Sequence, residues 1–496
     1  MKRGSKGSIT IYLAMVFSIM IALIFTLVED VRAQAVRMSL ECAMDLSLYS
    51  IFAEYHRELL EQYDLFFIDT GYGDTPSIDN TQQHLKGYMK DNFTFELDEK
   101  GLVLCDFLKM EVEQAKICSY TRATDEAGAV FKRQAVAYMK DQTGLSYLQK
   151  WTNQMEVVKE NQLLTRDITA ERTAIEQEID SIQIPKEKVS EEEYREVPLE
   201  NPADKINATR SAGILHLVID DTSSISSEIV DVATYVSHRD VRKGYGLLER
   251  KKASAVEDLL YHEYILNKCG NYTDPLEKGR LKYQTEYILA GKENDMDNLK
   301  WVVNRLLLLR EVSNVTYIYT DSTKMMEAEL LALGLAAVVK QPDLVEPVKN
   351  SILFAWAYVE SVYDVKQLLA GEKVPLMKER GNWHYSLSGM LGFGNGPGRK
   401  ADNDKSTGEF AEKVVDQGVS NQLELSYKDY LRILLTTLPE KDSVFRMMDI
   451  VEMDIRKTTG NVNFSMDGCV DYIDAKVYGS SGFGTVLEIR RSYCFF

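Results

Sequence analysis

The chain has 496 residues, 45% of them hydrophobic, so it can bury one large core or two to three ordinary ones. The net charge is −18, and lysine and arginine form no stripe in the body. Nucleic acid and anionic lipid surfaces require a basic surface, so the composition argues against both as main partners. The low number of prolines, 10, favours a mostly helical protein, while the 27 tyrosines suggest some sheet. We therefore expect a helix-dominant α+β fold.

The first apolar segment runs from Ile9 to Val28 without a charged side chain. About 20 residues at helical rise span about 30 Å, the thickness of a bilayer core. Residues 1–8 before it are basic, whereas Glu29 and Asp30 after it are acidic. The positive-inside rule therefore predicts a cytoplasmic tail over 1–8, a transmembrane helix over 9–28 and an extracytoplasmic body from Glu29 onward.

A cleaved signal peptide is the competing interpretation, because "AQA" at Ala33 to Ala35 has the small residues that signal peptidase needs. However, the apolar segment exceeds the usual 7 to 15 residues, and acidic residues lie between it and the cut. An apolar stripe continues the helix at three- and four-residue steps through Val31, Ala35, Met38, Cys42, Leu46, Tyr49 and Ala53. We therefore predict a retained anchor that continues as a stem helix to about Gln62.

The start "RGSKGSITIYLAMVFSIMIALIFTLVEDVRAQA" combines a basic Gly-Ser segment, one apolar helix and a small-residue-rich helix. This arrangement resembles the amino terminus of TadE/TadG-like proteins of tight-adherence pilus systems, over about fifty residues. The resemblance implies a cell-envelope protein with pilus-assembly proteins as partners. In pilin-type precursors the cut follows a glycine, and a glutamate is the fifth mature residue. A cut after Gly7 would place Tyr12 there, which favours a fixed anchor over a polymerising pilin.

The chain also resembles an uncharacterised bacterial family that shares this start. This similarity extends through residues 281–321, "LKYQTEYILAGKENDMDNLKWVVNRLLLLREVSNVTYIYTD". That family brings no known activity, so the resemblance implies no site residue.

β-formers at two distant places predict strands, near residues 93–121 and in a hairpin near 462–495. We expect these strands to pair in one small antiparallel sheet, which makes the helical part of the chain a large insertion. Pairing confined to each end of the chain is the simpler alternative.

The remaining patterns divide the body into four parts. Residues 29–183 are expected to hold the stem, the first strands and a coiled-coil-like helix from Leu148 to Ile182. That helix is expected to pack on another helix of the same chain, with a dimer partner as the alternative. Residues 184–205 are charged and contain prolines, which predicts a linker. A helical domain over 206–440 and a C-terminal helix and hairpin over 441–496 follow.

The segment "HLVIDDTSSIS" places Asp220, Thr222 and Ser224 in the D-x-[ST]-x-S spacing with which a von Willebrand A domain begins its metal site. A hard cation there also needs oxygens from later loops of a doubly wound sheet. The downstream chain is helical, so we favour the alternative, the end of a helix followed by a polar turn. The acidic segment 291–298 lacks the Gly and Glu of a calcium loop and predicts a turn before a helix N-terminus.

The six cysteines match neither a zinc ribbon nor a redox C-x-x-C. In an extracytoplasmic body, Cys105 with Cys118 and Cys469 with Cys494 are the candidate disulfides, because each pair could lie on neighbouring strands. Buried free thiols are the alternative.

The six histidines are scattered, and no nucleophile motif has a supporting context. The sequence therefore yields no catalytic residue and no cofactor site. A structural component of a Tad-like pilus or secretion assembly is the leading hypothesis, followed by a membrane-tethered adhesin or receptor. An anchored hydrolase ranks third. Oligomeric state cannot be assigned from these patterns.

Overall fold

The computed structural model describes residues 6–93, 110–142, 144–184, 186–188, 194–196, 198–211, 214–246, 254–393, 424–482, 484 and 486–495. Helices dominate and the sheets are small and antiparallel, which confirms the α+β prediction. The chain divides into two compact units. The stem unit comprises residues 1–138, 233–254 and 451–496, and the helical unit comprises 139–232 and 255–450.

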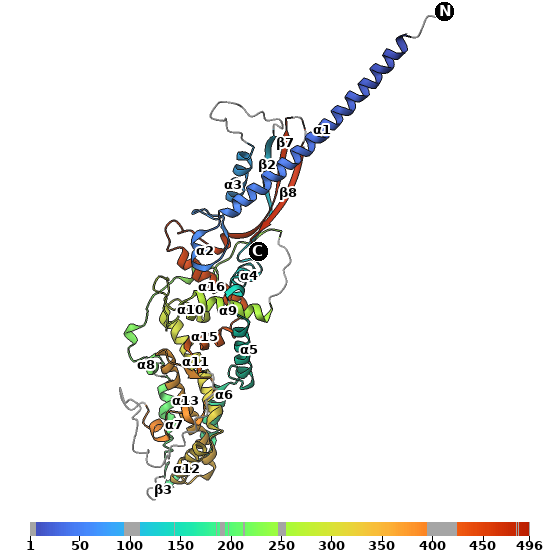
Figure 1. Ribbon diagram of the computed structural model, residues 1–496. Helices are drawn as coiled ribbons and strands as arrows, with labels where there is room; N and C mark the ends of the chain where they lie inside the picture. The colour runs from blue at the N-terminus through green and yellow to red at the C-terminus, as the bar shows by residue number, and fades with distance from the viewer. Residues whose placement is uncertain are drawn as a thin grey trace, which may run out of the picture. The chain divides into compact units, whose positions relative to one another are not determined.

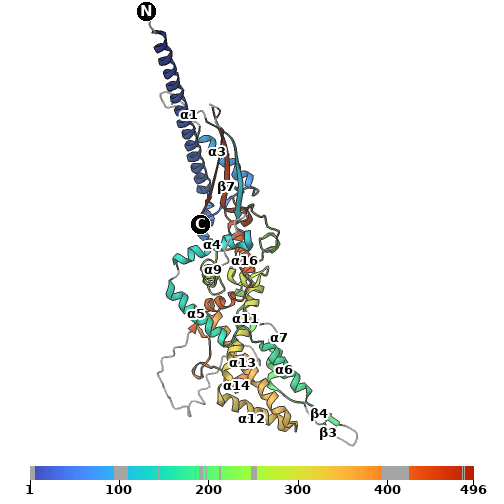
Figure 2. The ribbon, with the colours of Figure 1, turned by 90° about the vertical axis from the view of Figure 1, so that its right-hand side faces the viewer.

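The stem unit begins with α1 (Lys6–Ala53), one continuous helix of 48 residues. Its apolar N-terminal part is exposed and long enough to cross a membrane, and it extends beyond the sheet of this unit (Figures 1 and 2). The helix ends before the predicted Gln62. The chain turns at Tyr55, which bridges to Ile68, and His56 caps the separate helix α2 (Arg57–Tyr63).

The sheet of the stem unit joins strands from both ends of the chain. β7 (Cys469–Ser481) is central and pairs antiparallel with β1 (Ile68–Asp69), β2 (Met110–Arg122) and β8 (Val486–Cys494). The β2–β7 register runs from Met110 opposite Ser481 to Arg122 opposite Val470. This pairing confirms the split sheet and rules out the alternative in which each end of the chain pairs only with itself.

The second half of α1 packs on this sheet. Leu40 and Met44 of α1 are fully buried in one core with Ile473 and Val477 of β7. At Gly479 the strand lies so close to the helix that a Cβ atom would come within 2.9 Å of a Leu40 methyl group. α3 (Ile78–Asp91) also contacts α1 and β2. The stem helix and the sheet therefore form one packed body.

The helical unit is built around α13 (Val345–Leu369), which is buried on almost every side. Its neighbours include α11 (Asp295–Ile318), α12 (Ser322–Val338) and α6 (Ile168–Ser181). The other elements are α5 (Leu145–Glu160), α7 (Pro202–Ser211), α8 (Leu215–Val218), α9 (Ala255–Lys268), α10 (Gln284–Ala290), α14 (Leu387–Leu391), α15 (Tyr427–Leu435) and the hairpins β3–β4 (Lys186–Lys188, Tyr194–Glu196) and β5–β6 (Val374–Pro375, Glu424–Leu425). Two further helices each contain a boundary between the units. The boundary after residue 138 falls in α4 (Asp125–Gln142), and the boundary after residue 450 falls in α16 (Glu440–Ile455).

The coiled-coil-like helix predicted from Leu148 to Ile182 is two helices, so this prediction was wrong. α5 ends before a turn in which Gln162 has a left-handed backbone (φ 52°), and Asp167 caps α6 by accepting a hydrogen bond from Ala170 N at 3.0 Å. Both helices fall in the helical unit, although the sequence had grouped residues 29–183 with the stem. Trp151, Val158 and Ile168 are buried, so the apolar seam is covered by the chain itself.

We predict that Leu40→Ala lowers the free energy of unfolding of the stem unit by about 2 to 5 kcal/mol, because it leaves a cavity between α1 and the sheet. Val486→Ala is the matched control, since Val486 lies on β8 of the same unit but is 62% exposed. Its effect should stay within about 0.5 kcal/mol. Urea unfolding of the full chain in detergent micelles, with hydrogen exchange of β7 amides, measures both. Equal losses would contradict the packing described above.

Candidate functional site

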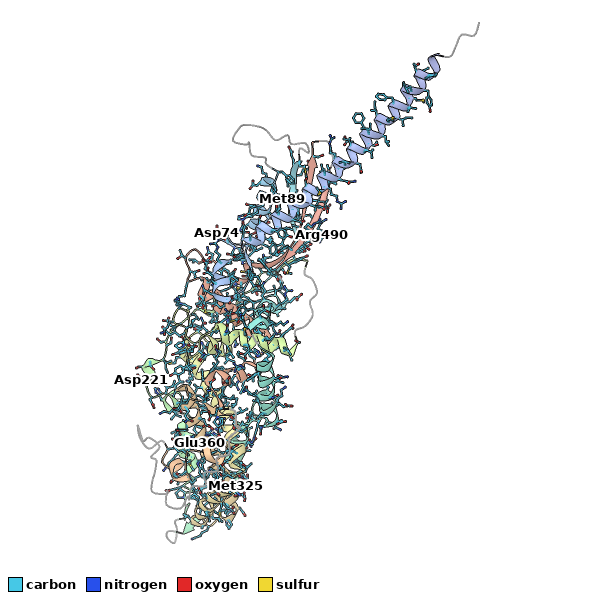
Figure 3. The ribbon with its side chains drawn as sticks, in the orientation of Figure 1. Asp74, Met89, Asp221, Met325, Glu360 and Arg490 are labelled. Atoms are coloured by element: carbon cyan, nitrogen blue, oxygen red, sulfur yellow. The ribbon has the colours of Figure 1, made fainter. Side chains whose placement is uncertain are left out.

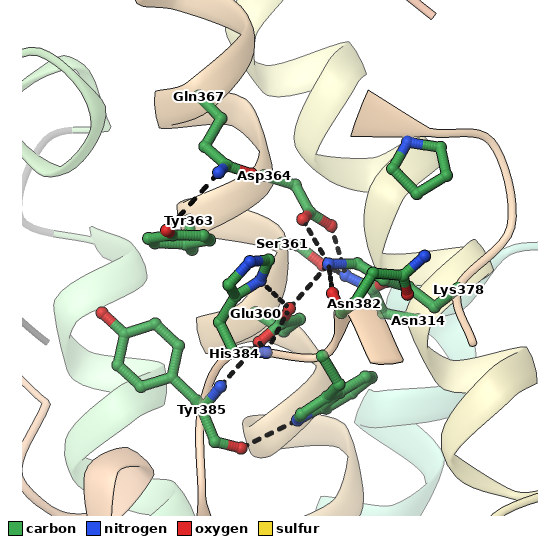
Figure 4. Close-up of polar contacts among 12 residues, drawn as sticks. Asn314, Glu360, Ser361, Tyr363, Asp364, Gln367, Lys378, Asn382, His384 and Tyr385 are labelled. Atoms are coloured by element: carbon green, nitrogen blue, oxygen red, sulfur yellow. Dashed lines mark hydrogen bonds and ion pairs between the residues drawn. The ribbon is translucent and has the colours of Figure 1, made fainter. Parts of the chain in front are cut away.

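The helical unit holds a cluster of buried charges around α13 (Figures 3 and 4). Glu360 and Asp364 lie one turn apart on α13, so their carboxylates share one face of the helix. Arg310 reaches them from α11, and Lys378 reaches them from the segment after β5. These four side chains are at most 1% exposed.

Each carboxylate of the cluster is paired with a cation. Lys378 Nζ lies 2.6 Å from Glu360 Oε1 and 2.6 Å from Asp364 Oδ1. Arg310 Nη2 lies 2.9 Å from Asp364 Oδ2. Two positive and two negative charges therefore balance one another. Charges removed from water are tolerated only when paired and hydrogen-bonded in this way.

Arg310 also fixes the segment that carries Lys378. Its Nη1 donates to Pro375 O at 2.8 Å and to Leu376 O at 2.9 Å. The same nitrogen lies 2.9 Å from the hydroxyl of Tyr430 on α15. The guanidinium thus joins α11, α13, α15 and the β5 segment through hydrogen bonds of a fixed planar geometry.

His384 is the member of the cluster that reaches the surface, with its side chain 35% exposed. Its Nδ1 lies 3.0 Å from Glu360 Oε1, and the backbone N–H groups of His384 and Tyr385 each donate to Glu360 at 3.0 Å. Burial raises the pKa of Glu360, but the hydrogen bond from His384 and the charge of Lys378 outweigh it and leave this pKa lowered. Glu360 is therefore ionised at neutral pH.

Glu360, Asp364 and His384 are also close enough together to offer three ligands to one metal ion. The Lys378 ammonium, however, lies between the two carboxylates, at 2.6 Å from each. A divalent cation would have to displace it and leave a buried lysine without its partners. The arrangement therefore suits an internal ion pair network that holds helices together better than it suits a metal centre.

A second buried acid, Glu286 on α10, has no cation beside it in the described chain. Its Oε1 accepts hydrogen bonds from Tyr272 N at 2.8 Å and from the Tyr427 hydroxyl at 2.7 Å, while Oε2 has no partner among the described residues. Burial raises the pKa of Glu286 to about 7. The hydrogen bonds from Tyr272 and Tyr427 lower this pKa, but by less than burial raises it. Glu286 therefore titrates near neutral pH.

The three residues with metal-site spacing lie in an exposed turn after α8. The Asp220 carboxylate is 85% exposed and lies 2.6 Å from Lys366 Nζ. Thr222 and Ser224 belong to a short 3-10 turn that Asp221 caps by accepting a hydrogen bond from Ser223 N. In the acidic segment 291–298 the predicted turn before a helix N-terminus is present, and Asn294 caps α11 by accepting a hydrogen bond from Asp297 N.

The structure does not bring the second cysteine pair together. Cys469 lies opposite Asp69 in the sheet, whereas Cys494 lies opposite Tyr472. The buried Cys469 Sγ is 3.6 Å from Ser465 O, the contact of a thiol. Cys118 is a thiol on β2, and Cys105 lies outside the described residues.

Sequence reasoning missed the charge cluster, although a signal was present. Glu360 and Asp364 interrupt an apolar helix, and Arg310 follows four leucines in "LLLLREV". Lys, Arg, Asp and Glu are seldom fully buried unless paired, so charges inside apolar runs predict such pairs. The pattern could not tell which cation meets which acid.

The fold and these clusters define a helix-dominant α+β protein with an apolar N-terminal helix and a buried ionic core. Residues 192–481 match the model of a family described as "Family of unknown function (DUF5702)". The match covers more than half of the chain, so the chain belongs to this family. Among curated proteins and solved structures, no significant match was found. The family description assigns no activity.

We predict that Lys378→Met destabilises the helical unit by about 3 to 5 kcal/mol, because it leaves buried carboxylates short of a partner. Lys373→Met is the matched control, because Lys373 is exposed five residues earlier and its loss should cost under about 0.5 kcal/mol. Urea unfolding of the full chain followed by circular dichroism measures the difference. If Lys378→Met were as stable as the control, the charge cluster would not contribute to the stability of the helical unit.

Glu286 predicts a pH dependence of stability. Because its pKa is about 7 in the folded protein against an ordinary 4.5, the folded state binds the proton more tightly than the unfolded chain. Stability should therefore fall as the pH rises from 4.5 to 7, by about 3 kcal/mol from this group.

The measurement compares wild type with Glu286→Gln, which keeps the shape and cannot ionise. The variant should gain about 3 kcal/mol over wild type at pH 7.5 relative to pH 4.5 in urea unfolding. Glu277→Gln, at an exposed glutamate, should show no such gain. The same pH profile in all three proteins would contradict a raised pKa at Glu286.

Proposed function

We propose that this protein is a single-pass, membrane-anchored component of the cell envelope with an extracytoplasmic body, serving structurally in a Tad-like pilus or secretion assembly. The observation that carries the proposal is α1, one uninterrupted helix with two different halves. Its apolar N-terminal half is exposed, and its second half is packed on the sheet of the stem unit.

The exposed half of α1 is unfavourable in water and favourable in lipid. Burial of apolar side chains gains about 25 cal/mol for each Å² removed from water, and a helix of this length satisfies its own backbone hydrogen bonds in a bilayer. The basic residues before Ile9 and the acidic pair Glu29 and Asp30 after the segment support a cytoplasmic N-terminus.

The structural role is supported by the rigid connection between the proposed anchor and the sheet of the stem unit. Between Val28 and the sheet there is no linker, because α1 continues unbroken into the Leu40 contact with β7. The buried ion network likewise joins helices of the helical unit, with the Lys378 ammonium 2.6 Å from each of its two carboxylates. The choice of a Tad-like assembly rests on the resemblance of the first fifty residues to TadE/TadG-like proteins.

A membrane-tethered adhesin or receptor is the second candidate. One observation favours it: the family match begins at residue 192, so what defines the family is the body and not the anchor. Purification of the intact protein in mild detergent separates the two functions. Co-purifying components of a secretion machine support the first, and a single exogenous ligand supports the second.

We predict that the wild-type protein stays in the membrane after carbonate extraction and that external protease degrades its body on intact spheroplasts. Replacing Ile19 and Ile24 together by Asp should release it, because each charge at the helix centre costs about 3 kcal/mol of insertion. Ile19→Leu with Ile24→Leu is the matched control and should remain anchored. A body protected from external protease would overturn the proposed orientation.

A further inference from the structure

The stem helix has a second apolar face, which the stem unit covers only at one edge, where the Tyr49 ring lies 5.2 Å from the ring of Tyr493 on β8. The side chains on the sheet side include Val36, Leu40 and Met44. The stripe from Val31 to Ala53 lies on the other side of α1, since successive residues of a helix are 100° apart. Its larger members remain exposed in the described structure: Val31 66%, Met38 66%, Leu46 54% and Tyr49 54%.

The spacing of this Val31–Ala53 stripe follows the helix axis. Val31, Cys42 and Ala53 repeat every 11 residues, which is about 3.67 residues per turn and close to that of a straight helix. The same steps continue toward the N-terminus through Leu27, Ile24, Met20 and Val16. A partner that covers the stripe outside the membrane therefore lies beside α1 inside it as well.

We propose that the stripe is covered by α1 of a second copy of this chain, in a parallel and in-register pair. The inference rests on the proposed membrane anchoring, because two copies inserted in the same sense bring the same residues to the same height. An antiparallel pair is incompatible with that insertion. The stem helices then form a paired stalk over about 33 Å, from Val31 to Ala53.

The charges beside the stripe fit this arrangement. Asp30 and Arg32 lie on opposite flanks of Val31, so a parallel pair sets Asp30 of one copy beside Arg32 of the other, in addition to the pair that Arg32 makes with Glu29 of its own chain at 2.9 Å. An antiparallel pair would bring like flanks together. Burial of Met38 and Leu46 supplies the main driving force, and the flanking charges select the orientation.

Cys42 lies at the middle of the stripe and is exposed. In the proposed pair the two Cys42 side chains occupy one layer, within the distance that a disulfide needs. Added diamide accepts the two electrons and two protons of the two thiols and leaves one S–S bond. The native chain thus contains its own crosslinking probe.

The experiment oxidises full-length protein in native membranes with diamide and measures covalent dimer on non-reducing gels. Wild type should give a dimer, and Cys42→Ser should reduce it at least about tenfold. In the Cys42→Ser background, Met38→Cys on the stripe should restore the dimer. Arg37→Cys, exposed one residue away but off the stripe, should not. Leu46→Glu with Cys42 intact should lower the dimer yield about tenfold.

The outcomes separate this inference from the proposed function. Protein found in the membrane fraction but giving no Cys42 dimer overturns the paired stalk and leaves the anchor standing. Equal crosslinking from Met38→Cys and Arg37→Cys shows random collision and also overturns it, as does a Cys42 crosslink to a different protein. Protein absent from the membrane fraction overturns both proposals.

Discussion

The pairing of β2 with β7 joins segments more than three hundred residues apart, and the remaining architecture depends on it. Met110 to Arg122 run antiparallel to Ser481 to Val470, which closes the stem unit around chain segments from both ends. Once this sheet exists, α1 has an apolar surface on which to pack. The helical unit forms its own core from residues 139–232 and 255–450, which lie in sequence between β2 and β7.

The helical unit contains charged side chains inside an apolar core, where each needs a partner of opposite charge. Arg310, Glu360, Asp364 and Lys378 balance as two cations and two anions and are joined by short contacts. Such a network adds little net stability compared with apolar packing, but it costs much when one partner is lost. It therefore specifies how α11, α13 and the β5 segment fit together.

The proposed anchor, the stem and the exposed stripe all belong to the single helix α1. α1 passes from the proposed membrane segment to the sheet without a flexible joint. It also offers a second apolar face that extends along the same line. A helix that is apolar on two opposite sides can pack on its own domain with one side and, as we propose, on a second copy of the chain with the other.

Local patterns in the sequence were sufficient for the features that one helix or strand carries by itself. The uncharged run from Ile9 to Val28, the Val31–Ala53 stripe and the turn before a helix N-terminus in residues 291–298 follow from side-chain chemistry and spacing within a few turns. The tertiary structure alone decided which face of α1 the sheet buries, because both faces are apolar. It also decided that Lys378 meets Glu360 and that no cation among the described residues lies beside Glu286. These outcomes depend on contacts between distant segments, and charge pairing in a core has no local periodicity from which it could be predicted.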